Sequence, residues 1–298
     1  MHSLKQQYEI SGIKYQVLRL KTSLFCPQKA RKNHFFIRLI LLNLRSVKKS
    51  QFMKILVCIS NVPDTTTKIS FTNGDTTFNT AGVQFIINPY DEWYALVRAL
   101  ELKEAQGGNV TIIHVGAADS EATIRKGLAI GADDAVRIDA EPNDAFAVAE
   151  QIAAYAKGKG FDLIMAGKET ISYNGSMVGA MLSELLNLPF VSMATKLEIA
   201  NNVATIEHDI DGGTEVVECP LPLVLSANKG MAEARIPNMR GIMAARTKPL
   251  EIVAAVAADK LTTITGFTLS KGRTDCKYID AATPEKLIEL LHTEAKVI

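Results

Sequence analysis

Apolar and polar positions follow two different periods along this chain. Short runs rich in apolar and β-branched residues predict buried strands at residues 54–59, 110–115, 135–138, 161–166 and 191–194. Between them, apolar residues recur at helical spacing, which predicts helices at residues 91–105, 120–130, 143–157 and 175–186. Strands separated by helices of this length form βαβ units. The pattern therefore predicts an α/β fold, a parallel sheet with helices on both faces.

Beyond residue 195 the pattern changes to alternation of apolar and polar residues. It predicts an antiparallel hairpin region with strands at residues 196–199, 204–209 and 215–218, and then a buried strand at residues 223–225. A smaller hairpin is predicted where residues 69–71 and 76–79 flank the turn Asn73-Gly74-Asp75.

The chain is less regular after Pro249, and Thr283-Pro284 opens a final helix with an apolar stripe. We expect an α/β domain at residues 53–248 and an extended C-terminal arm at residues 249–298.

Charge is distributed unevenly along the chain. Residues 1–52 hold 11 Lys and Arg and one acid, Glu9, so the remainder carries 22 basic and 31 acidic residues. This basic leader could be a targeting peptide or a membrane-surface helix, whose apolar stretch 34–44 is too short to span a bilayer. We favour a third interpretation, an upstream start codon assigned in error, with a leader that is otherwise disordered. Met53-Lys54 leads at once into the first predicted strand.

Cysteine usage bears on the compartment and on metal binding. The chain has four cysteines, Cys26, Cys58, Cys219 and Cys276, and none has C-x-x-C spacing. We therefore expect a reducing compartment and no metal site. We expect neither a nucleic-acid partner nor stable insertion into a membrane.

A polar loop follows the predicted strand 161–166. It contains Thr170, Ser172, Asn174, Gly175 and Ser176 and leads into a predicted helix. Small residues let the backbone approach a ligand, and the free N–H groups at a helix start bind phosphate. The loop matches neither the Walker pattern nor G-x-G-x-x-G. It is either a phosphate-binding loop or an ordinary strand-to-helix connection with a polar cap.

Two further segments carry candidate chemistry. In Asn88-Pro89-Tyr90-Asp91-Glu92, the pattern fits a turn and helix cap, or an Asn88 that recognises an adenine or ribose edge. Cys58 is more typical of a small buried residue than of a nucleophile. In residues 235–243, Met239 lies between Arg235 and Arg240, which suits weak docking of several partners or simple packing on the core.

Several ordered motifs resemble one protein family. Residues 206–226 combine an Asp211-Gly212-Gly213 turn, Glu215 and a Pro222 that leads a buried strand. In this order they resemble the signature of the beta subunit of electron transfer flavoproteins. His208 stands where that signature expects Lys or Arg. Further matching segments are residues 54–59, 61–64, 88–92, 121–133 and 167–170, so the resemblance covers residues 53–298.

The resemblance implies a fold, a ligand and a set of site residues. The fold would be of the adenine nucleotide alpha hydrolase-like, Rossmann-like type, with AMP bound in this subunit. The alpha subunit would hold most of the FAD. The AMP pocket would include Cys58, Asn88, Tyr90, Asp91, Val115, Thr170, Ser172, Asn174, Gly175 and Ser176.

The resemblance also implies partners. The chain would form a heterodimer with the alpha subunit, contacting it through the C-terminal arm. It would accept electrons from flavin dehydrogenases, such as the acyl-CoA dehydrogenases of fatty acid β-oxidation, and pass them to a membrane-linked quinone oxidoreductase. Met239 would be the docking anchor, flanked by Arg235 and Arg240. The subunit would have no catalysis of its own, and we expect a bacterial cytoplasmic location rather than the mitochondrial matrix.

The turn at residues 172–176 departs from the family pattern. It has the short length of electron-bifurcating members, which bind a second FAD here and oxidise NADH, but it lacks their acids. AMP is the favoured ligand and a second FAD the alternative. A further alternative is an ATP-binding stress-type protein, which predicts a homodimer and leaves residues 206–226 unexplained.

Overall fold

The computed structural model describes residues 7–10, 13–16, 52–142, 144–270 and 276–298. The chain divides into two compact units, Met1–Ser50 and Gln51–Ile298. Within the first unit, β1 (Gln7–Ile10) and β2 (Ile13–Gln16) pair antiparallel. The expected basic leader otherwise lies outside the described residues.

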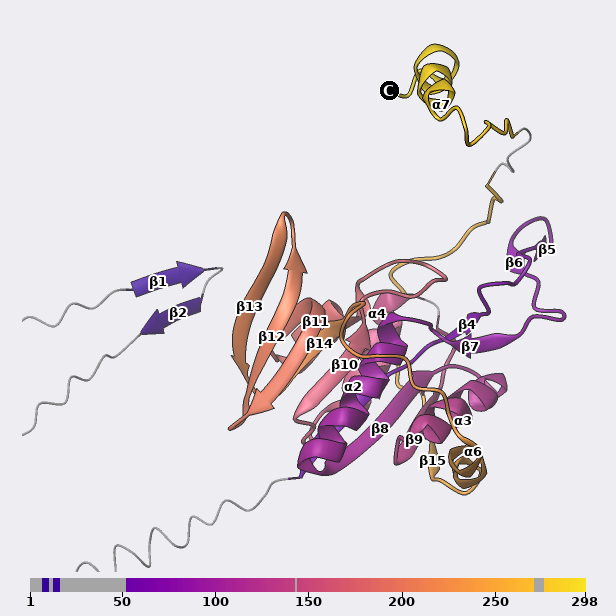
Figure 1. Cartoon of the computed structure of the whole chain (residues 1–298). Helices are drawn as coiled ribbons and strands as arrows, with labels where there is room; N and C mark the ends of the chain where they lie inside the picture. The colour runs from indigo at the N-terminus through magenta and orange to yellow at the C-terminus, as the bar shows by residue number, and fades with distance from the viewer. Residues whose placement is uncertain (1–6, 11–12, 17–51, 143, 271–275) are drawn as a thin grey trace, which may run out of the picture. The chain divides into compact units, whose positions relative to one another are not determined.

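A nine-stranded sheet forms the body of the second unit, in the order β13-β12-β11-β14-β10-β3-β8-β9-β15 (Figure 1). Its parallel part holds β3 (Met53–Cys58), β8 (Gly108–Val115), β9 (Asp134–Asp139), β10 (Leu163–Gly167), β14 (Leu223–Ala227) and β15 (Leu250–Ala254). The antiparallel extension holds β11 (Phe190–Ala200), β12 (Val203–Ile210) and β13 (Gly213–Pro220), with β11 parallel to β14.

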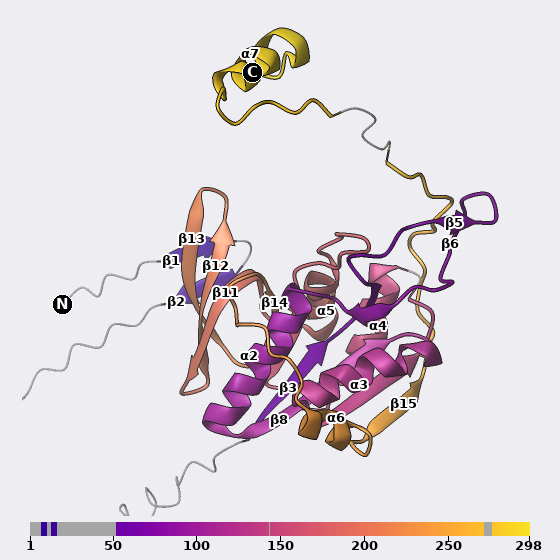
Figure 2. The ribbon, with the colours of Figure 1, turned by 45° about the vertical axis from the view of Figure 1, so that its right-hand side comes forward.

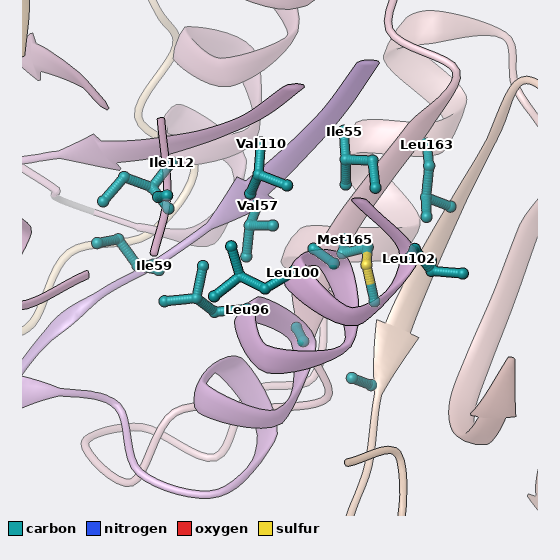
Figure 3. Packing of buried hydrophobic residues seen from close by; sticks show 14 of the residues in the cluster. Ile55, Val57, Ile59, Leu96, Leu100, Leu102, Val110, Ile112, Leu163 and Met165 are labelled. Carbon is teal, nitrogen blue, oxygen red and sulfur yellow. The ribbon is translucent and has the colours of Figure 1, made fainter. Parts of the chain in front are cut away.

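Helices cover both faces of the sheet. Alternate residues of β3 point to opposite sides, so that Ile55 and Val57 belong to one apolar cluster and Leu56 and Cys58 to another. The first cluster packs against α2 (Asp91–Gln106) and α3 (Glu121–Ile130), and Figure 3 shows Leu96 and Leu100 of α2 directed at these strands. The second packs against α4 (Ala145–Ala156) and α5 (Val178–Leu186). The α/β architecture predicted from the sequence is confirmed.

The helix α2 also fixes the antiparallel extension. The Arg98 guanidinium donates a hydrogen bond of 3.1 Å from Nε to the carbonyl of Leu197, and the Gln106 amide donates one of 2.8 Å to the carbonyl of Ile199. Both acceptors lie on β11. The hairpin region is thereby held beside the parallel sheet by side chains that reach its backbone.

Several elements differ from the sequence-based prediction. The helix α5 begins at Val178 rather than at residue 175, and α4 begins at Ala145 with Asp144 as its N-cap in place of Asn143, which lies outside the described residues. Residues 250–254 form strand β15, parallel to β9, where no regular element is predicted. Residues 239–245 form the helix α6 (Met239–Ala245) where a loop is predicted.

Smaller elements complete the unit. The pair β4 (Asn61–Pro63) and β7 (Phe85–Ile87) flanks the predicted hairpin of β5 (Phe71–Thr72) and β6 (Thr77–Phe78), which is confirmed. The predicted final helix is α7 (Glu285–Leu290), followed by a π-helical turn, Leu291–Ala295, and none of the residues of α7 is buried. Within the described part of the chain, no helix is long and apolar enough to cross a membrane.

Candidate functional site

The sheet has a topological switch point beside its first strand. From β3 the chain proceeds to β8 and β9 on one side, and then returns to β10 on the other side. In open α/β sheets, ligands bind outside the carboxyl ends of the strands at such a point. Here the loop after β10 meets the segment that opens α2. The candidate site lies where these two segments are in contact.

Asn88 joins the two segments. Its side chain is 1% exposed; Nδ2 donates a hydrogen bond of 2.9 Å to the carbonyl of Glu169, and Oδ1 accepts one of 2.9 Å from the backbone N–H of Ile171. Because both ends of the amide bind the backbone of the loop, Asn88 braces this loop. The geometry gives no support to Asn88 as a direct reader of an adenine edge.

Glu92, to which the sequence analysis assigned no role, is buried at the same place. One carboxylate oxygen accepts a hydrogen bond of 2.6 Å from the backbone N–H of Ser60, and the other accepts one of 2.7 Å from the Ser60 hydroxyl. Burial is the main cause that raises the pKa of Glu92 to about 8, although the bonds from Ser60 oppose it. This carboxyl group fastens the loop after β3 to the first turn of α2.

Gly167 allows these segments to approach. A Cβ atom at this position would lie 2.7 Å from Cγ and 3.0 Å from the backbone nitrogen of Glu92. Only glycine therefore lets the end of β10 pass so close to the start of α2.

A cavity of about 310 Å³ opens between these segments and the end of β14. Ligand pockets are usually about 300–1,000 Å³ in volume, so the cavity is at the small end of that range. Lys168 and Lys229 line it together with the carboxylates of Asp91 and Glu169, and the Lys168 ammonium lies 3.2 Å from the Glu169 carboxylate. Its lining residues are Pro89, Tyr90, Asp91, Lys168, Glu169, Ile171, Asn174, Asn228 and Lys229.

Tyr90 has an unusual backbone conformation. It is the residue before α2 and has φ 67° and ψ −98°. Positive φ is uncommon for a bulky residue and is costly unless the surroundings enforce it. Its ring is 57% exposed. The strained backbone thus presents an aromatic face at the cavity.

The loop after β10 is longer than the sequence predicts. Because α5 begins at Val178, Gly175 and Ser176 precede the helix instead of opening it. Asn174 and Ser176 adopt left-handed conformations with φ 49° and 52°, and the Ser176 hydroxyl donates a hydrogen bond of 3.2 Å to Glu169. The free N–H groups at the start of α5 therefore lie beyond this turn, and phosphate binding by the loop stays a prediction.

The structure brings together only part of the predicted pocket. Tyr90, Asp91 and Asn174 line the cavity, while Thr170, Ser172, Gly175 and Ser176 belong to the loop at its edge. Cys58 and Val115 are buried in the cluster packed against α4 and α5 and do not line it. Burial raises the pKa of the Cys58 thiol, which fits a small buried residue rather than a nucleophile.

The segment with the docking candidates carries an exposed apolar patch. Met239 is 73% exposed at the start of α6, but Ile236, two residues before the N-cap Asn238, is 85% exposed. Arg240 is exposed beside them. Arg235 is already engaged, because its guanidinium binds the Glu104 carboxylate at 2.6 and 3.1 Å.

Comparison with known proteins places this chain in a family. The model of the electron transfer flavoprotein domain matches residues 75–258, more than half of the chain. The chain is 36% identical to "Electron transfer flavoprotein subunit beta" of Bacillus subtilis, over 83% of this chain and 100% of that relative. It is 38% identical to the protein of the same name from Syntrophomonas wolfei, over 73% of this chain and 86% of that relative.

A relative with a different name also matches. The chain is 31% identical to "Acryloyl-CoA reductase electron transfer subunit gamma" of Anaerotignum propionicum, over 67% of this chain and 77% of that relative. These matches leave the ATP-binding stress-type alternative without support. The chain belongs to the electron transfer flavoprotein family and resembles its beta subunits.

Proposed function

We propose that this chain is the beta subunit of a heterodimeric electron transfer flavoprotein. Alignment with the whole length of a relative named as that subunit carries the proposal. The heterodimer with an alpha subunit accepts electrons from flavin dehydrogenases, such as acyl-CoA dehydrogenases, and delivers them to a membrane-linked quinone oxidoreductase. FAD, held mainly by the alpha subunit, supplies the electron-carrying chemistry. The chain supplies position and charge, and it has no catalysis of its own.

We propose that the cavity at the switch point holds AMP. Its volume of about 310 Å³ suits one nucleotide better than a dinucleotide. Lys229 offers positive charge to a phosphate group, as does Lys168, whose ammonium also pairs with the Glu169 carboxylate at 3.2 Å. Asn174 offers an amide to a base or ribose. A ligand that binds only the folded protein stabilises it, so the nucleotide would serve a structural role.

A second FAD in this subunit, as in electron-bifurcating members that oxidise NADH, is the alternative. The turn at residues 172–176 favours it, since this turn has the short length of those members. Its side chains are exposed. The absence of acids in this turn removes repulsion of phosphate and suits either ligand.

We propose that Ile236, Met239 and Arg240 form the contact for flavin dehydrogenases. The two apolar side chains are exposed next to a cation, which is the composition of a small docking patch. Because two of the named relatives are bacterial subunits of the same kind, we place the heterodimer in the bacterial cytoplasm.

Anaerobic mixing experiments on the co-expressed heterodimer test this function. An acyl-CoA dehydrogenase reduced by its substrate should bleach the flavin absorbance of the heterodimer within the mixing experiment, and NADH should not. Reduction by NADH alone would favour the bifurcating alternative. A heterodimer that neither donor reduces would contradict both.

A further inference from the structure

The first part of the C-terminal arm is bound to the body of the protein through its backbone. The Gln151 side chain of α4 accepts a hydrogen bond of 2.9 Å from the N–H of Val256 and donates one of 2.7 Å to its carbonyl. The Glu150 carboxylate accepts one of 2.9 Å from the N–H of Asp259. Since these contacts bind main-chain groups, they fix the path of the arm and leave its side chains free.

Asp144 serves the helix and the arm at once. One oxygen of its carboxylate caps α4 by accepting a hydrogen bond of 2.7 Å from the N–H of Ala147. The other accepts hydrogen bonds of 2.7 and 2.8 Å from the N–H groups of Leu261 and Thr262. These hydrogen bonds, above all the one from Ala147, hold the pKa of Asp144 below its usual value. The group is therefore an anion at neutral pH.

A second anchor lies on the β5–β6 hairpin. The Phe267 ring stacks on that of Phe71 with centroids 4.6 Å apart and an interplanar angle of 4°, and Phe71 in turn meets Phe78 edge-on. The N–H of Phe267 also donates a hydrogen bond of 2.8 Å to the carbonyl of Asp75 in the turn. Figure 2 shows the arm passing beside this hairpin.

The hairpin has little stability of its own. Each of its strands is two residues long, and among the strands that the structure describes these two pair only with each other. An isolated two-stranded hairpin is at best marginally stable in water. The stacked Phe267 therefore contributes much of what keeps it ordered.

We propose that residues 256–267 act as a strap that couples the hairpin to the start of α4, and that the hairpin keeps its order only while the strap is latched at both ends. Asp144 latches one end and Phe71 the other. The strap follows β15, α4 follows β9, and the hairpin follows β3 and β4. Because these strands of the sheet are parallel, all three segments begin at the carboxyl edge of the sheet, which also carries the cavity. This inference does not depend on the nucleotide assignment.

The strap also carries exposed apolar side chains. Val256, Leu261 and Ile264 of the strap are 45%, 63% and 46% exposed. Hydrogen bonds to α4 and its N-cap hold the backbone at Val256 and Leu261, which sets the positions of these two side chains. The rest of the arm therefore continues from Phe267, which is held on the hairpin.

Hydrogen exchange of the full-length chain, read by mass spectrometry in peptides covering residues 71–78, tests the strap. Phe267→Ala removes one latch. Asp144→Asn weakens the other, because it leaves one acceptor oxygen for the α4 cap and the arm together, and an amide nitrogen cannot accept an N–H group. Lys260→Ala, at an exposed position of the strap, is the matched control, and peptides from β3 and β8 report global stability.

Phe267→Ala should speed exchange in the hairpin roughly threefold to tenfold, the effect of losing one aromatic pair. Asp144→Asn, which does not touch the hairpin, should speed it in the same peptides, and Lys260→Ala should not. Exchange unchanged in both latch variants would overturn the proposal. So would a response confined to Phe267→Ala, because the two anchors would then act independently.

Discussion

At the scale of single residues, the switch point depends on three closely packed residues whose replacement would break specific contacts. Asn88, Glu92 and Gly167 bring together the loop after β3, the start of α2 and the loop after β10. The sequence offered only Asn88 as a candidate. Glu92 follows another acid in the first turn of a helix. Such acids usually face solvent and interact favourably with the helix dipole. The burial of Glu92 follows from the close approach that Gly167 permits.

Glu92 should make stability depend on pH. Its pKa of about 8 in the folded protein lies above the ordinary value of 4.5, so the unfolded chain loses the proton first as pH rises. The stability that the protonated form contributes is complete below pH 4.5 and is lost as pH rises through 8. We expect the free energy of unfolding to fall by at most about 1.4 kcal/mol per pH unit across this window.

Urea unfolding between pH 7 and 8.5 provides the measurement, since the lowered pKa of His114 leaves that group neutral there. Glu92→Gln, which keeps the shape and cannot ionise, should flatten the dependence. Equal slopes in the two proteins would show that Glu92 is already ionised at neutral pH.

Gly167→Ala should destabilise the protein by about 1–3 kcal/mol, the usual cost of overpacking, because the new methyl group meets the backbone of Glu92. Gly175→Ala is a suitable control, since its Cβ would meet only Met177 at an ordinary 3.5 Å. Thermal unfolding of both variants compares them. A similar loss in both would mean that the close approach at Gly167 relaxes readily.

At the scale of elements, periodicity predicted the buried strands and the helices that cover them. It failed for β15, whose alternation is short and whose residues are mostly exposed at the sheet edge. It failed also for the start of α5, because Gly175 and Ser176 have the composition of a helix opening, yet Asn174 and Ser176 adopt left-handed conformations. Tertiary contacts decide such cases, and a single sequence does not display them.

Two residues that line the cavity directly follow a strand that the sequence predicts to be buried. Asn228 and Lys229 directly follow β14, and polar residues after a buried strand belong to the ligand-binding edge of a parallel sheet. That signal was available in the sequence and was missed. The side on which Cys58 and Val115 point could not be predicted, since it depends on the register of each strand.

Asn88→Ala should loosen the loop after β10. The variant leaves the carbonyl of Glu169 and the N–H of Ile171 without their partner, at a cost of about 1–3 kcal/mol. Nucleotide should then leave the heterodimer faster during dialysis. Proteolysis within residues 170–177 should rise in parallel; retention of nucleotide together with unchanged proteolysis would contradict the bracing role.

At the scale of the whole molecule, one chain combines a cavity that we propose holds a nucleotide, an exposed apolar patch and an arm with exposed apolar side chains. Each suits a subunit that works with partners. The patch and the cavity are carried by different elements, so their effects should be separable.

Ile236→Ala and Met239→Ala should each slow electron transfer from an acyl-CoA dehydrogenase about fivefold to thirtyfold, as loss of a central interface contact does. Nucleotide content should not change. Ile69→Ala, another exposed apolar position, is the control. Second-order rate constants from stopped-flow mixing measure the effect, and unaltered constants in both variants would remove the docking assignment.

The central claim is that this chain holds a nucleotide within a two-subunit electron carrier. The most direct measurement is to co-express it with the alpha subunit, denature the purified complex, and identify the released nucleotides by mass. We predict one FAD and one AMP per heterodimer. Two FAD and no AMP would contradict the AMP assignment, and a chain that purifies without a partner and releases ATP would contradict the account as a whole.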